Sequence, residues 1–399
     1  MERLNNYYLF TEIKRRPSFK RKLLFANKYL QYQISKNKLP TRIISQILSL
    51  KPPLIRSWKK KIPSLVKIAS QIPSKRLTKK YQWLNFHMMG QWLYKDFIMV
   101  PTSIENYEDI TFVLNQLKNL RNKKVIQWRK KYGIISKEQA FGYVIGLMIS
   151  DADKDRGLSI SSRIRIGLSK RYDWNITIGE ALCYCLSILG VHAKRVKDGK
   201  PQKRAPSGRY IWRSELTPFI TWLKGAVLGL KPHETTTYTK VKMPWVYSCP
   251  KEMLIWVLNG IYDGDGCAYI RGWQITNAAR PNQDFINNIL KRFKIKSVTR
   301  GPKSIIETKG SLVSAASLPI FRFATGKVEK TKHLIKMMEN SNFISERDDY
   351  NKIMKNIFTL YRKGISQKDI PFHIYKKYKI GVHPRRIYTV LKRGDLFDV

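Results

Sequence analysis

Acidic residues are scarce in this chain. Asp and Glu together number 28, against 76 Lys and Arg, which gives a formal net charge of +48 over 399 residues. Such an excess of one sign repels itself in a compact state unless a polyanion neutralises it. The charge balance therefore predicts a nucleic acid as the binding partner.

Cysteines and long apolar runs are also lacking. The four cysteines have neither the CxxC nor the Cys/His spacing of a zinc site, and they are too few for a disulfide framework. No unbroken apolar run approaches 18 residues, and charges are mixed throughout the first 25 residues, so we expect neither a membrane span nor a signal peptide. We expect a cytoplasmic, nucleoid-associated protein, with an organellar location left open.

The most distinctive feature of the sequence is a pair of apolar stretches, each long enough to form a helix. They are Phe141 to Asp151 (FGYVIGLMISD) and Ile255 to Asp265 (IWVLNGIYDGD). Small residues four apart, such as Gly142 and Gly146, let two helices approach closely along their backbones. Each stretch ends in a carboxylate, which is disfavoured at the negative end of a helix unless a cation lies nearby. The pair predicts two packed helices that direct acids at a shared metal.

The residues after each stretch repeat one order of elements. Ser136 and Gln139 form a capping box for the first helix, and Cys249 with Pro250 are expected to begin the second. In the first copy we expect strands at 158–169, 191–197 and 209–213, and helices at 172–189 and 217–230. In the second copy we expect strands at 269–276, 295–300 and 320–325, and helices at 281–293 and 329–338. An offset of 114 residues superposes Gly146 on Gly260 and Asp151 on Asp265, which predicts an internal duplication.

The chain divides into five regions on this basis: 1–75, 76–135, 136–240, 241–342 and 343–399. The first is basic and rich in proline; residues 41–61 are typical of a helix-turn-helix, although a plain basic helical hairpin explains them as well. Residues 76–135 are expected to be helical, with no chemistry assigned. Near the C-terminus, a turn at Gly381 followed by Arg385 and Arg386 again indicates a helix-turn-helix-like domain.

The segments GLMISDA at 146–152 and GIYDGDG at 260–266 resemble the two signature helices of single-chain LAGLIDADG homing endonucleases, over roughly residues 136–340. The resemblance implies an α+β fold, in which two pseudo-symmetric halves of order α-ββ-α-ββ-α form a DNA-binding saddle flanked by basic helical extensions. It also implies a monomeric, intron-encoded hydrolase that recognises a long asymmetric site and cuts both strands of duplex DNA. The cofactor would be Mg²⁺ or Mn²⁺.

The same resemblance assigns roles to residues. Asp151 and Asp265 would be the catalytic acids and metal ligands, together with Ala152 and Gly264 at the neighbouring positions. Asp263 superposes on Ile149, so it has no counterpart and is expected to be structural. Arg213 or Lys327 would supply a basic group near the scissile phosphate. The expected DNA-binding residues are Ser159, Ser161, Arg163, Arg165, Arg209, Arg213, Arg271, Gln274, Thr276, Asn277, Arg322, Lys327, Arg385 and Arg386.

Two other functions stay open at the level of sequence. One is a DNA-binding transcription regulator that keeps this scaffold, which loss of the acids would mark; both acids are present here. The other is an intron maturase that binds structured RNA with the same basic surfaces.

Overall fold

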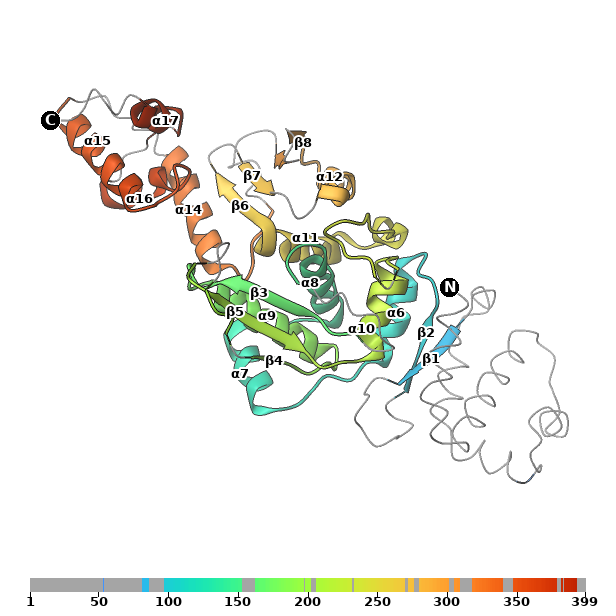
Figure 1. Cartoon of the computed structure of the whole chain (residues 1–399). Coiled ribbons are helices and arrows are strands. Elements are labelled where there is room, and N and C mark those ends of the chain that lie inside the picture. Colours follow the sequence, from blue (N-terminus) through green and yellow to red (C-terminus); the bar gives the residue numbers. More distant parts are fainter. Residues whose placement is uncertain are drawn as a thin grey trace.

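Figure 1 shows the computed structural model of the chain. The structure describes residues 53, 81–85, 97–152, 162–196, 198–201, 206–231, 233–269, 272–275, 280–300, 305–308, 318–339, 347–378, 382 and 384–392. The candidate N-terminal helix-turn-helix at 41–61 lies outside these ranges, apart from Pro53.

The first unit begins with helix α8, Lys137–Ile149, in the centre of the molecule (Figure 1). The expected capping box is confirmed, because Ser136 accepts from the Gln139 N–H and Gln139 accepts from the Ser136 N–H. From Ala140 to Ile149 every residue of α8 is buried, as in a helix that is apolar on all sides. The unit continues through β3 (Arg165–Ser169), α9 (Asn175–Ile188), β4 (Ala193–Arg195), β5 (Arg209–Ser214), α10 (Pro218–Trp222) and the π-helical turn η3 (Leu223–Val227).

The second unit follows a short 3-10 helix, η4, at Pro244–Ser248. It contains α11 (Lys251–Asp265), β6 (Gly266–Tyr269), β7 (Gly272–Ile275), η5 (Arg280–Asn282), α12 (Gln283–Arg292), β8 (Ser297–Arg300), β9 (Ile305–Thr308) and α14 (Thr325–Glu339). Both sheets are antiparallel, with strand orders β3-β5-β4 and β6-β7-β9-β8. In each sheet the last strand of the unit lies inside, next to the strand that precedes the middle helix. The mixed helix and antiparallel sheet agree with the expected α+β class.

Three expected elements of the second unit were wrong. The strand expected at 269–276 is a hairpin that begins at Gly266, directly after α11. The strand expected at 320–325 lies earlier, at β9, and residues 320–324 are irregular because the N–H groups of Arg322 and Phe323 bind the Asp263 carboxylate. Pro250, rather than Cys249, is the N-cap of α11.

Residues 81–132 are not purely helical, which corrects the expectation for 76–135. Strands β1 (Tyr81–Asn85) and β2 (Phe97–Pro101) form an antiparallel ribbon, which precedes α6 (Tyr107–Gln116) and α7 (Lys123–Tyr132). The large core shared by both units includes Ile98 and Val100 from β2 and Ile110 and Val113 from α6. Every residue of β2 is apolar, and Ile98 and Val100, two positions apart on one face of the strand, are buried.

The C-terminal residues form a small helical module with its own apolar core. It consists of α15 (Arg347–Arg362), α16 (Ile370–Tyr378) and α17 (Pro384–Lys392). Ile357, Ile374 and Ile387, one from each helix, are fully buried within it. Helix α14 leads from the centre of the molecule to this module (Figure 1). Within the described ranges, no helix combines the length and the apolar character needed to cross a membrane.

Candidate active site

Helices α8 and α11 touch along their backbones. A Cβ placed on Gly146 would lie 2.1 Å from the Val257 carbonyl oxygen, and one on Gly260 would lie 2.3 Å from that of Tyr143. Ser150 adds a link, since its hydroxyl lies 3.3 Å from the Gly260 carbonyl oxygen. The spacing of small residues thus produces the close helix pair that the sequence predicted.

The two acids lie at the same end of this pair. Asp265 is the last residue of α11, and Asp151 follows the C-cap of α8, Ser150. A Cβ on Gly264 would lie 2.4 Å from the Ser150 hydroxyl oxygen and 3.5 Å from the Cβ of Asp151. Ala152 is fully buried, and its N–H donates to the Leu147 carbonyl at 2.7 Å, which closes the end of the first helix. The structure therefore brings Asp151 beside the Gly264-Asp265 step.

The ammonium group of Lys327 lies at the C-terminus of α11. Its Nζ donates to the carbonyl oxygens of Tyr262, Asp263 and Gly264 at 3.1, 2.6 and 2.8 Å. This is the cation that a carboxylate at a helix C-terminus requires. Burial lowers the pKa of Lys327, while the nearby carboxylates of Asp263, Asp151 and Asp265 act in the opposite direction. Both candidate acids thus lie within electrostatic reach of one ammonium.

Asp263 explains how Lys327 reaches this position. Its fully buried carboxylate accepts the N–H groups of Arg322 and Phe323 at 3.0 and 2.8 Å and the Tyr143 hydroxyl at 3.0 Å. Burial raises the pKa of Asp263 despite these donors. The carboxylate therefore ties residues 322–323, just before α14, to both central helices. Asp263 was expected to be structural, and the structure shows what it holds in place: the segment that leads into α14 and Lys327. Nothing in the sequence indicated this contact.

Five cations share the open face of the first sheet. Arg165 pairs directly with Arg213, Arg213 with Lys194, and Ser169 with Arg209, so these side chains point to one side of the strands. Arg163 lies two residues before Arg165 and belongs to the same face. The opposite face is apolar and packs on α9, where the Trp212 ring lies against Gly179. Of the expected DNA-binding residues, this face contains Arg163, Arg165, Arg209 and Arg213; it also contains Lys194, which sequence reasoning missed.

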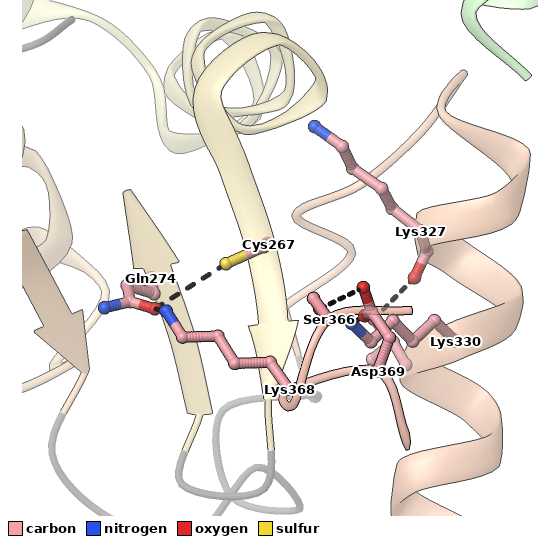
Figure 2. A network of polar contacts seen from close by, with 8 residues as sticks. Cys267, Gln274, Lys327, Lys330, Ser366, Lys368 and Asp369 are labelled. Carbon is pink, nitrogen blue, oxygen red and sulfur yellow. Dashed lines mark hydrogen bonds and ion pairs between the residues drawn. The ribbon is translucent and has the colours of Figure 1, made fainter. Parts of the chain in front are cut away.

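The second sheet differs on the corresponding side. Trp273 and Ile275 of β7 are buried in the core, so Gln274 points the other way, beside Cys267. Gln274 is only 4% exposed, and its amide oxygen accepts from Lys368 Nζ at 3.2 Å and from the Cys267 thiol at 3.7 Å. Figure 2 shows Lys368 extending across the strands to Gln274. The structure therefore places Gln274 beneath a contact with the C-terminal module rather than on an open surface.

That contact is one of several between the module and the rest of the chain. Lys330 of α14 pairs with Asp369, which also accepts the Ser366 hydroxyl at 2.7 Å (Figure 2). On the first unit, Arg171 Nη2 donates to the Gly364 carbonyl at 3.2 Å. Lys327 and Lys330 belong to the same turn of α14, so one helix joins the acid end of α11 to the module.

The remaining expected residues are placed as follows. Arg322 is exposed, and its guanidinium lies 3.9 Å from the centre of the Trp256 ring. Arg385 and Arg386 belong to the first turn of α17. Ser159, Ser161, Arg271, Thr276 and Asn277 lie outside the described residues.

The donor atoms at the helix ends suit a hard divalent cation, because they are carboxylate and carbonyl oxygens. Two acids from two helices are too few to enclose an ion by themselves. In agreement with this, the described residues contain no group of three or more His, Cys, Asp or Glu able to hold a metal. An ion held here would need further oxygen ligands from water or a bound substrate.

Comparisons with known proteins give limited matches. No protein-family model matches the chain. The probable translation initiation factor IF-2 of Methanocaldococcus jannaschii is 27% identical over 206 residues, which are 49% of this chain and 17% of that protein. The chain thus spans less than a fifth of the length of this curated relative.

Similar solved structures include three of the homing endonuclease I-DmoI. Mesophilic variants of it share 14% identity at a TM-score of 0.32, over 46% of this chain and 87% of theirs. Its complexes with DNA and Ca and with DNA and Mn share 14% and 13% identity at TM-scores of 0.34 and 0.31. They cover 49% and 47% of this chain, and 100% and 98% of their own. Scores of this size are too low to define a shared fold.

Proposed function

We propose that this chain is a site-specific DNA endonuclease that hydrolyses one phosphodiester bond in each strand of a duplex with a divalent metal ion. One observation carries the proposal. Asp151 and Asp265, which the LAGLIDADG resemblance assigns as catalytic, end two helices packed backbone to backbone, with Gly264 against Asp151. Cutting two strands requires two acidic centres close together, and this helix pair supplies them.

The acids would hold Mg²⁺ or Mn²⁺, with the carbonyl groups at Ala152 and Gly264 as the neighbouring oxygen donors. When bound, such an ion lowers the pKa of a coordinated water and neutralises charge on the departing oxygen. The Gly264 carbonyl already accepts Lys327 Nζ. Because a carbonyl oxygen has two lone pairs, this bond leaves one for an ion.

Of the two candidates for the basic group near the scissile phosphate, we favour Lys327 over Arg213. Lys327 lies at the acid end of α11, whereas Arg213 lies on the open face of the first sheet. The ammonium would stabilise negative charge that develops on a phosphate held between the acids. Arg213, with Arg163, Arg165 and Arg209, would contact DNA phosphates and guanine edges instead.

A long asymmetric site follows from the difference between the two sheets. The first presents five cations on its open face, whereas in the second Gln274 is bonded by the C-terminal module. Two unlike surfaces on a single chain would read unlike half-sites, which favours a monomer. The module would add DNA contacts from α17, because a short exposed helix after a turn is the usual reading element of a helix-turn-helix.

Cleavage of a randomised duplex library tests the proposal. Native protein with Mg²⁺ is expected to cut a small set of sequences, and Asp151→Asn and Asp265→Asn are each expected to abolish cutting of at least one strand. Asp284→Asn is the control, because Asp284 is exposed on α12 and forms an ion pair with the exposed Lys240, away from the helix ends. Full cutting of both strands by both variants would refute the assigned site. Sequence-specific binding without cutting would favour a regulator, and selective binding of structured RNA a maturase.

A further inference from the structure

A cavity of about 1020 Å³ lies at the edge of the first sheet, outside the central helix pair. It is open to solvent and is lined by the start of α7, the second half of α9, the edge strand β4 and the segment after β5. Arg163 and Arg213 line it and also belong to the open face of the sheet. The cavity therefore continues that basic face past its edge strand.

The walls of the cavity are mainly apolar. Trp128 of α7 and Leu216 after β5 contribute carbon surface, and so does Cys183 of α9. Burial raises the pKa of the Cys183 thiol to about 12, so it stays neutral at physiological pH. Leu216 is 41% exposed, so its side chain is available to a ligand. These walls suit a flat apolar group better than a hydrated ion.

Cations line the cavity as well. Lys123 and Lys124 come from the first turn of α7, Lys194 from β4 and Arg213 from β5. Among the described residues, none of these four side chains has a hydrogen bond or an ion pair, and the three lysines and Arg213 are exposed. The acid of the lining, Glu215, accepts the His192 N–H at 3.0 Å. The cavity therefore combines apolar walls with several unneutralised positive charges.

We propose that this cavity binds an unpaired nucleotide of a nucleic-acid strand, with the base against Trp128 and Leu216 and the phosphates on Lys123, Lys124 and Lys194. Its volume lies at the upper end of the range for small-molecule sites, about 300 to 1000 Å³. A base pair within a duplex cannot enter, because both of its faces are stacked. Aromatic and cationic groups together are the usual means of binding single strands.

Other occupants fit less well. A duplex backbone needs surface cations but makes no use of an apolar cavity. An acidic peptide would satisfy the lysines but leave the flat walls uncovered. The proposal does not depend on DNA cutting, since neither Asp151 nor Asp265 lines the cavity.

Photocrosslinking locates the nucleotide directly. Full-length protein is mixed with a 12-nucleotide strand that carries a single 5-iodouracil, irradiated and digested, and the crosslinked peptide is identified by mass spectrometry. The expected crosslinks fall within residues 120–128 or 213–216. Crosslinks confined to other segments would overturn the proposal.

Binding measurements determine how much the lysines and the apolar walls of the cavity contribute to the affinity for a single strand. Lys123→Gln/Lys124→Gln is expected to weaken binding of the same strand about tenfold at constant salt, as removal of two phosphate-binding cations should. The control is Lys118→Gln/Lys130→Gln, which removes the same charge from exposed positions outside the cavity. Leu216→Gln should reduce the preference for the intact strand over an abasic strand of equal length.

Two results would overturn the proposal. One is an equal decrease in affinity in the cavity variant and the control, which would indicate only general attraction to a basic protein. The other is an equal decrease in duplex and single-strand affinity in the cavity variant, which would indicate a backbone contact with no place for a base.

Discussion

Gly146 and Gly260 face each other across α8 and α11 with no space for a side chain on either. A Cβ on Gly260 would lie 2.8 Å from the Gly146 Cα and 2.7 Å from the Leu147 backbone nitrogen. Backbone atoms on both sides cannot rotate away, unlike the end of a flexible side chain. The distance between the two helices, and with it the separation of Asp151 and Asp265, is therefore set at this contact.

Gly260→Ala is accordingly expected to destabilise the fold by about 1 to 3 kcal/mol, as overpacking of a tight core does. Gly225→Ala is the matched control, because a Cβ there meets no atom within 4 Å and it should be neutral or slightly stabilising. The free energy of unfolding, measured by urea denaturation, distinguishes the two. Equal stability of both variants would mean that the helices are not in backbone contact.

Much of this helix pair could be predicted from the sequence. Local signals were sufficient: a capping box at Ser136, small residues four apart, and an acid at the end of each of two similar apolar stretches. The capping box is confirmed, as are the helices of the C-terminal region, because each depends on residues close together in the chain.

The rest depends on contacts between distant residues. Lys327 is 63 residues from Gly264, and the loop that brings it there is held by Asp263, which the sequence left without a partner. Gln274 is a polar residue between two buried apolar residues of β7, a pattern that predicts an open strand face. In the structure Lys368, 94 residues later, covers it. Such pairings follow from how the elements pack, and periodicity within a strand or helix carries no record of them.

Lys327→Met should separate catalysis from binding. Three carbonyl groups at the end of α11 would be left without their donor, so the free energy of unfolding should fall by about 1 to 3 kcal/mol. Cleavage should fall on the order of 10²-fold, because the ammonium charge near both acids no longer stabilises negative charge that develops on the phosphate. Duplex affinity should change little, because many other cations remain.

The matched control is Lys332→Met on the same helix, since Lys332 is exposed and makes none of these bonds. It should leave the unfolding free energy and the cleavage rate at native values. If Lys327→Met cuts at the native rate and binds duplex with unchanged affinity, the ammonium only stabilises the C-terminus of α11 and has no role in cleavage.

Acid should release the C-terminal module. Burial alone would raise the pKa of Asp369, but the Lys330 ammonium and the Ser366 hydroxyl outweigh it, and the pKa lies below its ordinary value. The carboxylate titrates near 3.9 in the unfolded chain. The stabilisation is therefore fully present above that pH and is lost as the pH falls through the lower pKa of the folded state.

Hydrogen exchange of the α16 amides between pH 7 and pH 3, corrected for intrinsic rates, measures this release. Native protein should lose protection in the acid range, whereas Asp369→Asn should be less protected throughout and show a weaker dependence on pH. His373 also faces Asp369, and burial lowers the pKa of its imidazole, so His373→Gln separates its titration from that of the carboxylate. An unchanged acid response in Asp369→Asn would assign the release to another group.

The open face of the first sheet should determine the salt dependence of DNA binding. Arg165 and Arg213 lie opposite each other on neighbouring strands, and the strand segments around them contain no acid. Removing one cation that binds a phosphate should reduce the slope of log K against log salt by about 1. Arg165→Gln/Arg213→Gln should therefore reduce it by about 2, provided both residues bind phosphates.

A guanine contact gives a different result. Replacing an arginine that reads a base edge should lower affinity for the preferred sequence by about 1 to 3 kcal/mol and relax specificity at one position. Titrating each single variant against the preferred and a scrambled duplex at several salt concentrations separates the two roles. Lys251→Gln is the control, because Lys251 is exposed at the opposite end of α11 from the acids. If the two arginine variants match this control on both duplexes, DNA does not lie on this face of the sheet.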